Sequence, residues 1–139
     1  MLHTAPKTEE IASITEQAFF KTDALIAGCW QGSTDGGTFA VENPATDEVI
    51  ALVANCGVIE TEQAIIAASD ALAGWAQTPA KNRAKILRSW FDLIIEHEQG
   101  LARLLTIEQG KPLDEALGEV RYGASYIEWF SEEAKRIYG

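Results

Sequence analysis

Cysteine is the residue type in this chain best suited to covalent chemistry, because its thiolate is a strong nucleophile. The sequence contains two, Cys29 beside Trp30 and Cys56 beside Gly57. Neither has a neighbouring basic residue that would favour the thiolate, and they form no C-x-x-C pair or cysteine-histidine cluster typical of zinc sites. We therefore favour an inert structural role for both cysteines and predict no metal site.

Histidine is the next candidate, as a general base. Neither His3 nor His97 has a serine, a cysteine and a carboxylate in an evident catalytic arrangement, and His97 lies between Glu96 and Glu98. A surface histidine is the favoured interpretation, and no catalytic residue is predicted in the chain.

A glycine-rich segment at residues 32–37 is a candidate phosphate-binding loop. It lacks the G-x-G-x-x-G order and precedes no predicted helix, so it presents no helix N-terminus to a pyrophosphate. A hairpin loop is therefore favoured over a cofactor site, and no cofactor-binding residue is predicted.

The last predicted helix carries two stripes at helical spacing. The first stripe is apolar and consists of Leu117, Val120, Ala124 and Ile127. The second mixes small, hydroxyl and aromatic side chains and consists of Gly118, Tyr122, Ser125 and Trp129. The second stripe is suited either to lining a channel or to packing against another layer, and packing is favoured from the residues alone.

The composition of the 139 residues excludes several classes of function. Hydrophobic residues make up 47% and charged residues 23%, which is ordinary for a globular protein. The net charge of −10 repels phosphates, so neither a nucleic acid nor an anionic membrane is an expected partner. The scarcity of cysteine and the absence of an apolar signal core predict a cytoplasmic protein.

Hydrophobic periodicity divides the chain into an N-terminal arm or helix at 1–23, a small β-meander at 24–56 and three or four helices within 61–138. The first of these helices is predicted over 62–77 with Thr61 as its N-cap, and the second restarts at Pro79. Its predicted buried stripe is Ile86, Leu87, Trp90, Leu93 and Ile94. A break is expected near Gln99-Gly100, a stop at Gly110, and a last helix from Leu113 to about Tyr138.

Four segments together resemble the start of an aldehyde dehydrogenase. They are Asn43-Pro44-Ala45-Thr46, residues 83–91, residues 105–112 and residues 128–139. The E-Q-G-K-P-L segment and the Y-I-E-W-F-x-E-E-A-K-R-I-Y-G ending are most similar to the bacterial succinate-semialdehyde dehydrogenase branch. The likeness spans nearly the whole chain and is weakest before Ala24.

The resemblance implies an α/β fold in which this segment packs on a Rossmann-like cofactor domain beyond the end of the chain. It also implies an enzyme that forms a homodimer or homotetramer and oxidises succinate semialdehyde with NADP or NAD through a cysteine thioester. The catalytic domain and every reacting residue are expected beyond Gly139, so the isolated chain is predicted to be inactive. NADP is preferred by analogy within the family.

The resemblance also gives a role to two positions of the last helix. Tyr122, with Gly118 one turn earlier, is implied to line the mouth of the aldehyde tunnel. Arg121 is suited to holding a carboxylate, although a solvated arginine is favoured. The segment 108–112 is a family marker with an expected structural role.

Two other functions remain open at this point. One is an aldehyde dehydrogenase of another specificity, such as glutarate semialdehyde. The other is a non-enzymatic acidic helical module, derived from the same scaffold, that binds a protein. A stop codon after Gly139 in the native gene would favour the module, whereas continuation into a cofactor domain would favour the enzyme.

Overall fold

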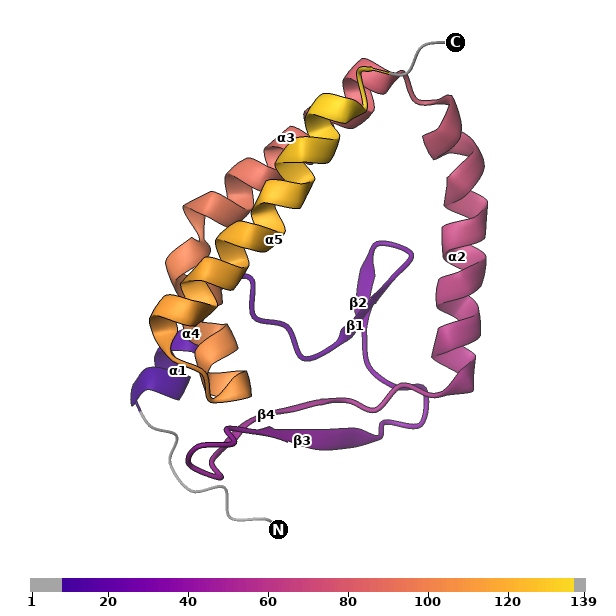
Figure 1. The fold of residues 1–139 in the computed structure, drawn as a ribbon. Helices are drawn as coiled ribbons and strands as arrows, with labels where there is room; N and C mark the ends of the chain where they lie inside the picture. The colour runs from indigo at the N-terminus through magenta and orange to yellow at the C-terminus, as the bar shows by residue number, and fades with distance from the viewer. Residues whose placement is uncertain (1–8, 137–139) are drawn as a thin grey trace. The chain divides into compact units, whose positions relative to one another are not determined.

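The computed structural model describes residues 9–136, which form two compact units. The first comprises 9–72 and 107–110, and the second 73–106 and 111–136. The elements are α1 (Glu9–Thr15), β1 (Ala24–Ile26), β2 (Cys29–Gln31), β3 (Thr38–Glu42), β4 (Val49–Ala54), α2 (Val58–Gln77), α3 (Ala80–Glu96), α4 (Glu98–Gln109) and α5 (Leu113–Glu133) (Figure 1). The mixed α/β class agrees with the prediction.

The strands form two separate antiparallel pairs, β1 with β2 and β3 with β4, in place of the predicted meander. Ala27 and Gly28 both have positive φ, 51° and 79°, and make the tight turn of the first pair. The predicted hairpin loop at 32–37 instead connects β2 to β3, which do not pair with each other. The meander was therefore wrong in its strand pairing, although the strands themselves are present.

The Glu60 carboxylate joins the glycine-rich segment to the start of α2. One oxygen accepts a hydrogen bond from the backbone N–H of Thr34 at 2.7 Å, and the other accepts one from the N–H of Gly57 at 2.7 Å. The second bond caps α2, which begins at Val58, so Thr61 is not its N-cap. Glu60 is only 4% exposed, and these bonds lower the pKa of its carboxyl to about 2, with the Thr34 contact the largest cause.

Gly110 ends α4 and lies against the turn between β3 and β4. Its φ of +71° is a left-handed conformation that favours glycine, and an added Cβ would lie 3.1 Å from Cγ of Pro44. The same turn is closed by the Asn43 side chain, whose Oδ1 accepts a hydrogen bond from the N–H of Ala45 at 2.9 Å. The predicted stop at Gly110 is confirmed.

In the second unit, α3 and α5 run side by side and antiparallel (Figure 1). The residues buried on them are small, namely Ala84 on α3 and Ala116, Ala124 and Ser131 on α5. Small side chains allow two helix backbones to approach closely. The break between α3 and α4 falls at His97, two residues before the predicted position, and α5 ends at Glu133 rather than near Tyr138, which lies outside the described residues.

Large apolar side chains remain exposed on several helices of the chain. On α3, Ile86, Trp90 and Leu93 are each more than half exposed, so their predicted burial was wrong within this chain. Leu87 and Ile94, from the same predicted stripe, are half-buried. The periodicity located the apolar side of α3 correctly, but the described residues supply no layer that covers it.

The Glu60 contacts predict how stability depends on pH. The folded pKa is below the usual value near 4.5, so the carboxylate stabilises the fold above pH 4.5 and this contribution is lost as the pH falls towards 2. Glu60→Gln should therefore lower the thermal midpoint of the chain at pH 7, and the difference from the parent should vanish near pH 2. Glu62→Gln, an exposed change on the same helical turn, is the matched control. Equal midpoints for Glu60→Gln and the parent at pH 7 would contradict this assignment.

Candidate functional site

Helix α5 places two different faces on opposite sides. It begins after Pro112, and Asp114 and Glu115 lie in its first turn, where the helix dipole favours negative charge. The apolar stripe predicted from the sequence is buried or half-buried, with Ala124 only 1% exposed. The mixed stripe is exposed at all four positions, Gly118, Tyr122, Ser125 and Trp129. Helical periodicity therefore separated the two faces correctly.

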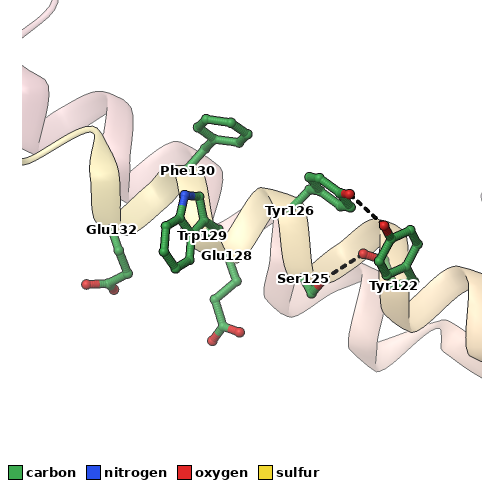
Figure 2. A pocket seen from close by; sticks show the side chains of 7 residues that line it. All are labelled: Tyr122, Ser125, Tyr126, Glu128, Trp129, Phe130 and Glu132. Carbon is green, nitrogen blue, oxygen red and sulfur yellow. Dashed lines mark hydrogen bonds between the residues drawn. The ribbon is translucent and has the colours of Figure 1, made fainter.

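A shallow groove of about 620 Å³ lies along the exposed face of α5 (Figure 2). Aromatic rings supply most of its apolar lining, and the residues that line it are Tyr122, Ser125, Tyr126, Glu128, Trp129, Phe130 and Glu132. The structure brings Tyr122 into this groove, and Gly118 lies on the same face one turn earlier. An ideal Cβ at Gly118 would meet nothing within 4 Å, so this position leaves open space beside Tyr122.

Two of the aromatic side chains in the groove, Tyr122 and Tyr126, also carry hydroxyls. The hydroxyls of Tyr122 and Tyr126 are 2.6 Å apart, and their rings pack edge to face with centroids separated by 5.1 Å. The hydrogen bond to Tyr122 raises the pKa of the Tyr126 hydroxyl above its usual value near 10. Sequence reasoning missed Tyr126, although its i+4 spacing from Tyr122 places both side chains on one face.

The charged groups beside the groove are paired. Glu128 accepts a hydrogen bond from Arg88 of α3 at 3.2 Å, and Glu132 lies 3.4 Å from the Lys135 ammonium. Arg121 forms a bidentate pair with Glu98 of α4, with both N–O distances 2.8 Å. This contact lowers the pKa of Glu98 and raises that of Arg121. The Arg121 guanidinium is thus held by Glu98 rather than simply solvated.

Of the other features considered from the sequence, part of the 32–37 segment and Cys56 line a common hollow of about 360 Å³. Cys29 is exposed and Cys56 half-buried, both as free thiols. The backbone N–H of Thr34, in the 32–37 segment, already donates a hydrogen bond to Glu60. It is therefore not available to a phosphate. His97 is exposed at the end of α3, and His3 lies outside the described residues.

Two further searches concern metals and membranes. Within residues 9–136, no group of three or more histidine, cysteine, aspartate or glutamate side chains is placed to hold a metal ion. The helices in this part of the chain are also too short or too polar to cross a membrane. We take the groove on α5 as the candidate site because it contains Tyr122, a position that the sequence singled out.

Paired strands and packed helices of this kind define a mixed α/β scaffold, and comparisons with known proteins identify it. Residues 30–139 match the aldehyde dehydrogenase family. The chain belongs to this family, as its sequence motifs implied.

Two curated relatives are semialdehyde dehydrogenases. The chain is 52% identical to the glutarate-semialdehyde dehydrogenase of Pseudomonas aeruginosa and 50% identical to the NADP(+) succinate-semialdehyde dehydrogenase of Escherichia coli. Each match covers 91% of this chain and 26% of the relative. The chain therefore spans about a quarter of the length of these relatives.

Solved structures confirm the fold. The succinate-semialdehyde dehydrogenase of Burkholderia pseudomallei matches with a TM-score of 0.83 and 52% identity, over 86% of this chain and 25% of that one. A betaine aldehyde dehydrogenase of Staphylococcus aureus, in complex with NAD+, matches with a TM-score of 0.82 and 30% identity, over 88% and 25%. Both structures are aldehyde dehydrogenases, as the predicted fold requires.

The two faces of α5 should respond oppositely to added side-chain volume. Gly118→Ala removes a flexible residue from an exposed helical position and should raise the free energy of unfolding by about 0.5–1 kcal/mol. Ala124→Leu overfills the buried face and should lower it by about 1–3 kcal/mol. Urea unfolding of the 139-residue chain, followed by circular dichroism, measures both. Changes of the same sign would contradict the assignment of the two faces.

Proposed function

We propose that the protein to which this chain belongs oxidises the semialdehyde of a dicarboxylic acid to the acid, with NADP or NAD as the hydride acceptor. The similarity to glutarate- and succinate-semialdehyde dehydrogenases over 91% of the chain supports this proposal. Succinate semialdehyde is the preferred substrate and glutarate semialdehyde the alternative. NADP is preferred because the E. coli relative is named for it.

In this proposal, residues 24–139 are the N-terminal part of a cofactor-domain scaffold, and residues 1–23 are an arm that precedes it. The reacting cysteine and the groups that bind the cofactor belong to a part of the enzyme outside these residues. The exposed apolar side chains of α2 and α3, such as Ile65 and Trp90, then pack against that part. The 139-residue chain alone is consequently inactive.

The groove on α5 forms part of the aldehyde tunnel, with Gly118 and Tyr122 at its mouth. Support comes from its aromatic lining, the open space at Gly118 and the exposure of Tyr122. The enzyme assembles as a homodimer or homotetramer and works in the cytoplasm.

A protein-binding module is the rival function, and the same exposed apolar faces favour it. The native gene separates the two. Expression of the whole gene should yield a protein much larger than 15.1 kDa that reduces NADP or NAD when given succinate or glutarate semialdehyde. A 15 kDa product without turnover would reject the enzyme and leave the module.

A bulky residue at Gly118 tests the tunnel. In the enzyme expressed from the whole gene, Gly118→Phe should lower kcat/KM for the semialdehyde about tenfold or more, because the ring obstructs the approach of the aldehyde. Gly123→Phe is the matched control: it is the same change at another exposed position of α5 with nothing within 4 Å of an added Cβ, about 100° around the helix from Tyr122. Equal losses in both variants would remove Gly118 from the tunnel.

A further inference from the structure

Tyr122 and Tyr126 place a pair of hydroxyls among the aromatic rings of the groove. Figure 2 shows the two hydroxyls pointing toward each other from successive turns of α5. Both side chains are accessible, with Tyr122 65% exposed and Tyr126 51% exposed. The edge-to-face contact of the rings, 5.1 Å between centroids, adds a second restraint on their relative orientation. The position of one hydroxyl therefore depends on the other residue.

A pair of phenols has a defined hydrogen-bonding capacity. One O–H is used within the pair, and the other remains available to donate to a ligand. When the first hydroxyl donates to the second, it polarises the second O–H and strengthens it as a donor. The raised pKa of Tyr126 has its hydrogen bond to Tyr122 as its largest cause, which agrees with Tyr126 donating and Tyr122 keeping the outward O–H.

The two carboxylates that line the groove, Glu128 and Glu132, are each paired with a cation. Glu132 lies six residues after Tyr126, which is about 9 Å along the helix axis. Its carboxylate is offset by Lys135, and that of Glu128 is offset by Arg88. The tyrosine end therefore offers a neutral donor that is suited to an anionic group.

We propose that the hydroxyl of Tyr122 binds the carboxylate end of the semialdehyde substrate, and that Tyr126 is the positioning residue that orients and polarises this hydroxyl. This proposal rests on the proposed function. It makes the pair a determinant of specificity for aldehydes with a distal anionic group over uncharged aldehydes of the same length. The hydrogen bonds would run in one direction, from Tyr126 to Tyr122 and from Tyr122 to the carboxylate.

The test compares the enzyme expressed from its whole gene with Tyr122→Phe, Tyr126→Phe and the double variant. Each keeps the aromatic ring and removes only a hydroxyl. Glutarate semialdehyde and pentanal are the substrates, because they differ only in the distal carboxylate. Tyr126→Phe should raise KM for the semialdehyde about 3- to 10-fold with kcat nearly unchanged, and should change KM for pentanal by less than about twofold.

The double variant distinguishes a coupled pair from two independent contacts. If Tyr126 acts through Tyr122, the ratio of KM for the semialdehyde to KM for pentanal should be no higher in the double variant than in Tyr122→Phe alone. Two results would overturn the proposal. One is that the effects of the single variants on KM for the semialdehyde multiply in the double variant. The other is that Tyr126→Phe changes KM for both aldehydes by the same factor. The latter result would assign Tyr126 to packing.

The parent enzyme separates this proposal from the proposed function. If the parent oxidises neither of these aldehydes nor succinate semialdehyde, the proposed function fails and the role of the tyrosine pair fails with it. If the parent oxidises glutarate semialdehyde and Tyr126→Phe retains its preference over pentanal, only the role of the pair is rejected.

Discussion

The left-handed backbone of Gly110 is the constraint on which the candidate site depends. A side chain at this position would be strained by the φ of +71° and would press against Pro44. Because α4 ends here, Pro112 can begin α5 two residues later. A residue inserted before α5 would turn the whole helix by 100° relative to the chain that precedes it, so the start of α5 decides which of its faces packs against α3 and which one, with Tyr122, is left exposed.

Local signals predicted the helices well. Pro79, Gly110 and Pro112 act through their own backbone geometry, so helix starts and stops were visible without knowledge of the rest of the fold. Neither the strand pairing nor the contact of Glu60 with Thr34, 26 residues away, was visible, because a hydrophobic pattern identifies elements without identifying their partners. The sequence signal that would have placed the start of α2 was Glu60, three residues after Gly57, which supplies the glutamate half of a capping box.

In the candidate site, too, features set by nearby residues were predictable and contacts between distant residues were not. Periodicity and the family resemblance together indicated Gly118 and Tyr122, and the i, i+4 rule would have added Tyr126. The partner of Arg121 was not predictable, because Glu98 lies on a different helix. The exposure of Trp90 was not predictable either, because a hydrophobic pattern identifies an apolar side without identifying what covers it.

The exposed apolar faces matter for how such a protein is made. Ribosomes add about 5–20 residues per second, so the enzyme proposed above, if it is as long as the relatives of which this chain spans about a quarter, would need tens of seconds for its remainder after these residues have emerged. During that interval Ile65, Trp90 and their neighbours meet water instead of their final packing partners. The nascent chain is then a natural client for chaperones, and its negative charge helps to keep neighbouring nascent chains apart.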